Sequence, residues 1–203
     1  MKKLLGLICA IVLLSTKVWA ADPSVIFIRN LADDIITNVL TSDVSREQKF
    51  ERFKHAFEDA LDLRSVGQFV LGVYWRRASE AEREAFLAAF IDFTTKTWAD
   101  RFDLYTGQKL VVSGTRNAEG NQLYVNSQIQ NNPPVEVIWR LKKLKNGQFK
   151  IIDIIVEGVS MAMSYRNEYS AFLQKNGGKL PVLTKELERK SANFKFTNAK
   201  AKK

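Results

Sequence analysis

The chain has 203 residues, of which 46% are hydrophobic and 26% are charged, and its formal net charge is +9. This length and composition suit one globular domain, or one domain with a small appendage, that has enough apolar residues for a core. The single cysteine, Cys9, excludes a disulfide framework, and one cysteine with one histidine, His55, is too small a set of ligands for a transition-metal site.

The first 20 residues have the pattern of a secretory signal. Two lysines precede an almost wholly apolar run at residues 4–14, and a possible cleavage site follows at residues 18–20, directly before Ala21. The apolar run is too short to span a bilayer comfortably. The bulky Ile8 before Cys9 argues against a lipoprotein anchor. We expect export and cleavage after Ala20, which leaves a domain at residues 21–194, a basic disordered tail at residues 195–203, and no thiol.

Most of the positive charge of the mature chain lies at its C-terminal end. Cleavage removes three lysines and lowers the formal charge from +9 to +6, and the seven basic and two acidic residues from Lys185 onward account for +5 of it. Such a tail is either simply solvated or weakly attracted to anionic lipid headgroups, with roughly 1 kcal/mol per basic side chain. Nucleic acid is not an expected partner, because the chain has no arginine-aromatic patch.

The first half of the mature chain is predicted to be helical. Apolar residues recur at helical spacing through residues 25–39, and the capping box Ser45-x-x-Gln48 opens a second helix. A short helix is expected at about residues 63–71. The capping box Ser79-x-x-Glu82 then opens the longest helix, which is predicted to carry a series of aromatic residues: Phe86, Phe90, Phe93, Trp98, Phe102 and Tyr105.

After Gly107 the apolar period changes to two, which predicts strands. Short turns separate them, so the sequence predicts a four-stranded antiparallel meander at about residues 110–117, 123–129, 135–141 and 149–156. The last strand is apolar on both faces except at Asp153, which predicts a central, covered strand. Two helices, at about residues 160–175 and 180–192, complete an α+β fold.

Three segments, in the expected order, resemble the MlaC family, also known as toluene-tolerance proteins. Residues 154–169 resemble its most characteristic motif, with Glu157-Gly-Val-Ser-Met161 at its centre. Residues 69–79 are similar to its FVLG-x-[YW]-[YW] element, and residues 86–90 with the exit turn at residues 105–108 are similar to its central helix. The resemblance spans about residues 25–190.

This resemblance implies a periplasmic phospholipid carrier, whose helices and sheet enclose an apolar lipid pocket in an NTF2-like arrangement. Its implied role is to maintain the lipid asymmetry of the outer membrane. The implied partners are the substrate-binding subunit of an inner-membrane ABC transporter and an outer-membrane lipoprotein bound to a porin. We expect a monomer without catalysis, metal or cofactor.

The family elements and the inner faces of the predicted strands nominate eight residues for the lipid pocket. Aromatic residues at helical spacing suit a solid core as well as a cavity, so the pocket itself follows from the resemblance alone. The nominated residues are Phe69, Tyr74, Phe90, Tyr105, Val137, Trp139, Val156 and Met161. The basic residues that flank the aromatic elements, Arg76, Arg77 and Arg101, are candidates for handing the lipid to partner proteins.

Three alternatives stay open at this point. A hopanoid-associated branch of the same family would bind a different lipid. Gly158-x-Ser160-x-Ala162 resembles the nucleophile elbow of a hydrolase, although such enzymes place their histidine after the serine and His55 precedes it. In the simpler interpretation Gly158 allows a sharp turn and Ser160 caps the next helix, while Asp153 and Glu157 make a structural salt bridge or cap. The third alternative is an interaction module with a solid core.

Overall fold

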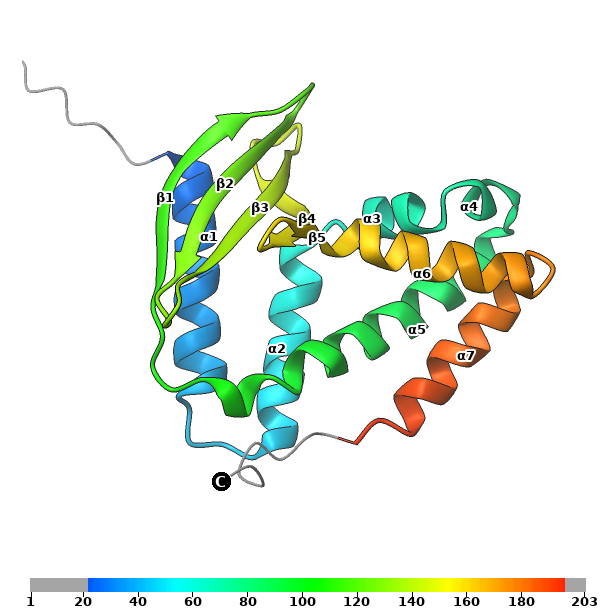
Figure 1. Ribbon diagram of the computed structural model, residues 1–203, viewed down its shortest axis with the longest axis horizontal. Coiled ribbons are helices and arrows are strands. Elements are labelled where there is room, and N and C mark those ends of the chain that lie inside the picture. Colours follow the sequence, from blue (N-terminus) through cyan, green and yellow to red (C-terminus); the bar gives the residue numbers. More distant parts are fainter. Residues whose placement is uncertain (1–21, 196–203) are drawn as a thin grey trace, which may run out of the picture.

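The computed structural model describes residues 22–195 of the chain (Figure 1). These residues form an α+β fold in which helices precede and follow an antiparallel sheet. In chain order the elements are α1 (Pro23–Asp34), η1 (Ile35–Leu40), α2 (Arg46–Ala60), α3 (Leu63–Leu71), α4 (Val73–Arg77), α5 (Glu80–Ala99), η2 (Phe102–Leu104), β1 (Leu110–Asn117), β2 (Gln122–Ile129), β3 (Val135–Lys143), β4 (Phe149–Val156), β5 (Val159–Ser160), α6 (Met161–Lys175) and α7 (Leu180–Ala192). The predicted signal at residues 1–20 and nearly all of the predicted tail lie outside the described residues.

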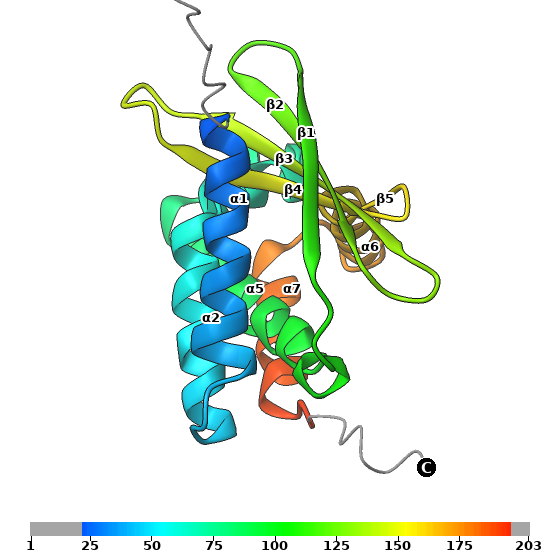
Figure 2. The ribbon, with the colours of Figure 1, turned by 90° about the vertical axis from the view of Figure 1, so that its left-hand side faces the viewer.

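The sheet is the predicted meander with one addition. Its strands follow the order β1-β2-β3-β4-β5, and all neighbours are antiparallel. The fifth strand, β5, was not predicted and has only two residues. Val125 pairs with Trp139, and Trp139 pairs with Ile154, so these apolar side chains share one face of the sheet. Helix α1 packs on the part of that face formed by β1 and β2 (Figure 2).

Strand β4 lies between β3 and β5 and is covered by helices, as predicted, but it is paired along only part of its length on the side away from β3. Beyond it lies only β5, which pairs with the last two residues of β4. Further along the same edge, Leu61 forms a parallel bridge with Ile151, and the Asp62 N–H donates to the Ile151 carbonyl at 2.9 Å. The apolar pattern of β4 agrees with its contacts with α2, α3 and α6, which cover the strand.

Both predicted capping boxes are present, but the longest helix is shorter than expected. Ser45 and Ser79 each cap a helix reciprocally with the residue three positions later. Helix α5 ends at Ala99 rather than near Tyr105, because the Arg101 N–H bonds to the carbonyl three residues back and a 3-10 turn follows. In that turn the Phe102 ring packs edge-on against Phe53 of α2 at 5.1 Å, which directs the chain away from the helix axis.

The apolar side chains form two clusters rather than one. One cluster lies among the helices α3 to α7 and includes Phe86, Tyr169 and Leu173, which are almost completely buried. The other lies between α1 and the sheet and includes Ile28 and Val125. Figure 1 shows the corresponding two layers, with α5, α6 and α7 extending away from the sheet. No helix within residues 22–195 is long and apolar enough to cross a membrane.

Asp62 links the two layers. Its carboxylate caps α3 by accepting from the Ser65 N–H at 3.0 Å, and it accepts a 2.8 Å hydrogen bond from Nζ of Lys142 on β3. Burial acts to raise the pKa of Asp62, but the hydrogen bonds from Lys142 and Ser65 outweigh it, so this pKa lies below its ordinary value. The charged form of Asp62 therefore stabilises the folded state.

Asp62→Asn is expected to lower the free energy of unfolding at pH 7 by about 1–3 kcal/mol, because the amide loses the charge-assisted bond to Lys142. A folded-state pKa below the unfolded value gives stability that is present above the unfolded pKa and lost as pH falls through the folded one. The free energies of unfolding of the variant and the wild type should therefore converge as pH falls below about 4. Urea unfolding at several pH values measures both effects, with the exposed Asp33→Asn as the control. If the variant and the wild type have the same free energy of unfolding at pH 7, or differ by the same amount at every pH, the stabilising role of charged Asp62 is contradicted.

Candidate functional site

A small apolar cavity lies where the two clusters meet. Its volume is about 30 Å³. Residues of both clusters line it: Val66 and Phe90 belong to the helical cluster, and Ile151 belongs to the cluster on the sheet. The residues around it come from α2, α3, α5, β4 and the start of α6, and they are Phe57, Leu61, Val66, Phe90, Thr94, Trp98, Ile151, Ile152, Asp153, Ile154, Met161, Ala162 and Tyr165. We refer to this junction as the seam.

Packed aromatic rings form the helical wall of the seam. The rings of Phe90 and Tyr165 meet edge-on at 5.4 Å, Phe86 stacks on Phe90 at 5.6 Å, and Tyr169 lies 5.8 Å from Tyr165. Burial raises the pKa of both tyrosines, so both phenols are neutral at physiological pH. The Tyr169 hydroxyl has no hydrogen-bond partner within residues 22–195. This side of the seam therefore presents an uncharged, largely apolar surface.

The turn from β4 into α6 fixes the other end of the wall. Gly158 adopts a φ of 77°, which a residue with a side chain rarely adopts, and the chain reverses there into β5. The Ser160 hydroxyl accepts from the Met163 N–H at 3.0 Å and donates to Asp153 at 2.6 Å. Both parts of the simpler interpretation, the Gly158 turn and the Ser160 cap, are confirmed.

Asp153 holds this turn against β4. Its carboxylate accepts from the N–H groups of Ile154 at 2.8 Å and Ala162 at 2.9 Å, as well as from Ser160. The side chain is almost wholly buried, and three donors compensate for the loss of water. The expectation that Asp153 acts as a cap is thus confirmed, and its cap keeps Met161 and Ala162 at the seam.

The geometry does not favour the hydrolase alternative. The hydrogen bonds of the Ser160 hydroxyl are to Asp153 and Met163. His55 lies on α2 with an exposed ring, 3.3 Å from Asp59. The described residues contain no group of three or more histidine, cysteine or acidic side chains that could hold a metal ion.

The structure brings only some of the eight nominated residues to the seam. Phe90 and Met161 line the cavity. Val137 pairs with Val156, and Trp139 pairs with the cavity-lining Ile154, so these three residues lie beside the seam on the sheet. Tyr105 is half-buried in the connection after η2.

The other two nominated residues lie on a different surface. The Phe69 ring is exposed beneath the guanidinium of Arg166, and Tyr74 lines a separate polar pocket. Sequence reasoning missed several lining residues, although a helical spacing of four could have found three of them. Thr94 and Trp98 follow Phe90 at that spacing, and Tyr165 follows Met161.

Comparisons with known proteins agree with this architecture. A family model described as MlaC protein matches residues 29–189. The intermembrane phospholipid transport system binding protein MlaC of Haemophilus influenzae is 27% identical over 124 residues, which span 58% of this chain and 57% of that relative. The chain therefore aligns with little more than half the length of this relative.

A solved structure is similar over a longer range. The phospholipid-binding protein of Ralstonia solanacearum, solved in complex with a phospholipid, superposes with a TM-score of 0.74 at 21% identity. The superposition covers 82% of this chain and 96% of that one, so the two proteins share the fold. Because the family model matches well over half of the sequence, this chain belongs to the MlaC protein family.

Proposed function

We propose that this protein is a periplasmic carrier that encloses the acyl chains of one phospholipid in the seam. The observation that carries the proposal is the apolar cavity between two separately packed clusters. Family membership and the phospholipid named for both relatives support it. In this proposal residues 1–20 direct export and are cleaved after Ala20, and the protein moves lipid without chemical catalysis.

The need for such a carrier follows from the cost of exposing acyl chains to water. Each methylene that enters water costs about 0.8 kcal/mol, so two long chains cost roughly 20 kcal/mol or more. An apolar seam replaces the interior of the bilayer, so the net free energy of transfer becomes small and the barrier to desorption falls. A headgroup that stays in water at the edge of the seam would be selected only weakly.

The seam must widen to hold two chains. A volume of about 30 Å³ has room for about one water molecule, whereas a pocket for two chains is on the order of 1,000 Å³. Because each cluster is packed within its own layer, the layers can move apart without breaking either cluster. The Asp62–Lys142 bond and the Asp153 cap connect the layers at β3 and β4 and are suited to act as the hinge.

The partners in this proposal are the substrate-binding subunit of an inner-membrane ABC transporter and an outer-membrane lipoprotein–porin complex. The name of the Haemophilus influenzae relative, a binding protein of a phospholipid transport system, supports a transporter partner. Arg76, Arg77 and Arg101 are exposed and could contact such partners.

Protein purified from a bacterial host without added ligand is expected to carry one diacyl phospholipid, since release into water re-exposes both chains. Native mass spectrometry should show the corresponding increment on a chain that begins at Ala21, and solvent extraction should identify the headgroup. A hopanoid in the extract would assign the protein to the other branch of the family. A lipid-free protein that also takes up no lipid from vesicles would refute the carrier.

Phospholipids with bromine-labelled acyl chains are expected to quench the fluorescence of Trp98, which lines the seam, but not the fluorescence of Trp75. Trp75 is buried in the helical cluster, with the guanidinium groups of Arg64 and Arg83 at 5.5 Å and 5.3 Å from its ring. The measurement compares two proteins without residues 1–20, one keeping only Trp98 and the other keeping only Trp75, with the remaining tryptophans changed to Phe. Equal quenching of both would place the chains elsewhere.

Ala162→Trp is expected to reduce the lipid content several-fold, because its side chain enters the wall of the seam. In the closed protein the added bulk should also cost about 1–3 kcal/mol through overpacking. Ala171→Trp, which adds the same side chain at an exposed position of α6, is the matched control and should retain its lipid. Lipid content is read by extraction and folding by thermal unfolding. A folded Ala162→Trp protein with normal lipid content would contradict the location of the site.

A further inference from the structure

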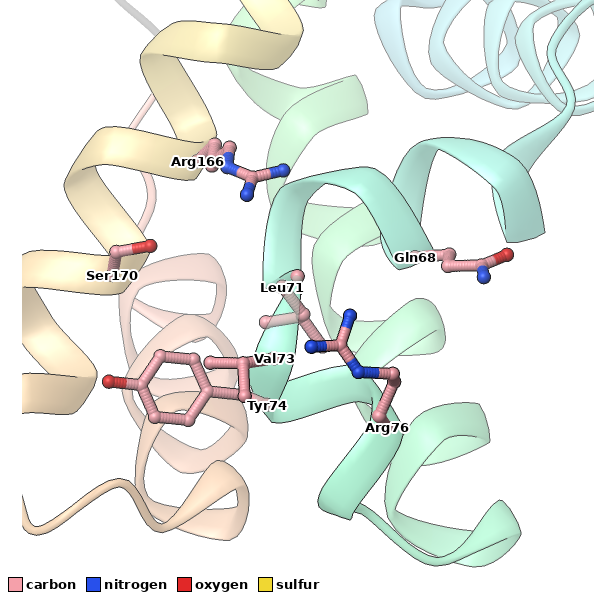
Figure 3. Close-up of a pocket in the computed structure, with 8 residues that line it drawn as sticks. Gln68, Leu71, Val73, Tyr74, Arg76, Arg166 and Ser170 are labelled. Carbon is pink, nitrogen blue, oxygen red and sulfur yellow. The ribbon is translucent and has the colours of Figure 1, made fainter.

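A second pocket lies on the outer side of α3, α4 and α6, and it differs from the seam in chemistry (Figure 3). Its volume is about 330 Å³, roughly ten times that of the cavity in the seam. Its lining combines two arginines with polar side chains and the turn between α3 and α4: Gln68, Leu71, Gly72, Val73, Tyr74, Arg76, Arg166 and Ser170. None of these residues lines the seam.

The pocket is positively charged. Arg76 and Arg166 both line it, and no carboxylate does. Neither arginine forms an ion pair with any residue in the described part of the chain. Two guanidinium groups that share a concave surface without a counter-charge repel each other, and this repulsion is relieved when an anion enters. The charge of the pocket therefore points to an anionic ligand.

Arg166 is held in place rather than free to swing into solvent. One of its terminal nitrogens donates to the Phe69 carbonyl at 2.8 Å, and its guanidinium lies 4.9 Å from the centroid of the Phe69 ring. The other terminal nitrogen faces the α3–α4 turn at Gly72, where a Cβ would lie only 3.1 Å from it. Gly72 also has a φ of 54°, so the backbone passes this close to the guanidinium because the residue is glycine.

Arg76 supplies the second cation. It lies in the last turn of α4 and is exposed, and within residues 22–195 it has no hydrogen-bond or ion-pair partner. In Figure 3 its guanidinium extends from α4 along the turn that carries Leu71. One anchored and one unpaired guanidinium fork match the several acceptor oxygens of a phosphate, and the polar residues Gln68 and Ser170 also line the pocket.

We propose that this pocket binds a phosphate group, at a site distinct from the seam. Helix α6 serves both sites with successive residues, since Tyr165 faces the seam and Arg166 faces the pocket. The phosphate can belong to a lipid headgroup at a bilayer surface or to a soluble phosphate ester, and both present the same oxygens. The partly exposed Phe69 and Val73 beside the arginines would contact the interface in the first case.

The test measures binding of glycerol 3-phosphate by calorimetry, and of vesicles with and without phosphatidylglycerol by sedimentation. Arg76→Gln and Arg166→Gln should each weaken binding of these probes by about tenfold or more, because each variant loses one charge-assisted contact to the phosphate. Arg77→Gln removes the same charge from an exposed residue of α4 that does not line the pocket, and it should change binding by less than about twofold. Because Arg76 has no protein partner to lose, its variant separates ligand contact from folding.

Binding of vesicles alone would identify the ligand as a headgroup within a bilayer, and binding of glycerol 3-phosphate as well would extend it to soluble esters. No binding in either format, or equal losses in the Arg76 and Arg77 variants, would overturn the proposal. The lipid content of the same variants, read by native mass spectrometry, should remain that of the wild type. A loss of lipid in Arg76→Gln would also overturn it, because the pocket would then be part of the seam.

Discussion

Each of the two layers of this protein buries its apolar side chains largely against its own members. The helical cluster is closed by α5, α6 and α7, and the cluster on the sheet is closed by α1. The two layers meet along strand β4, which contacts α2, α3 and α6. Close packing makes a single core resist insertion of a ligand, whereas a boundary between two cores can open by moving two intact bodies. The proposed carrier activity depends on this division more than on any individual side chain.

Two carboxylates connect the layers across this boundary. Asp62 ties the start of α3 to β3, and Asp153 ties the start of α6 to β4. Both carboxylates cap helix starts, so each stabilises a helix and a contact between layers at the same time. The rest of the boundary is lined mainly by apolar and aromatic side chains, which impose little directional preference on how far the layers separate.

The secondary structure followed well from local patterns, while the site followed only in part. Capping boxes, turn residues and the change of period at Gly107 act within a few residues, so they could be read directly. The end of α5 and the partial pairing of β4 on its far side depend on the packing of Phe102 against Phe53 and on the Leu61–Ile151 bridge, which no local pattern reports. Phe69 and Tyr74 were nominated from a family element, yet Tyr74 lines the outer pocket and Phe69 is exposed beside Arg166, because a helix distributes neighbouring residues over all its faces.

The margins of the sheet bear on how the protein behaves at high concentration. Unpaired strand edges are templates for polymerisation, because any extended chain can extend their ladder. On one side, β1 carries an irregularity between Val112 and Gly114 that interrupts a regular template. On the other side, β5 and the Leu61–Asp62 segment occupy stretches of the β4 margin. In the proposed carrier, separation of the layers would expose apolar surface, and the interrupted β1 edge and the partly occupied β4 edge would limit strand-to-strand association while the layers are apart.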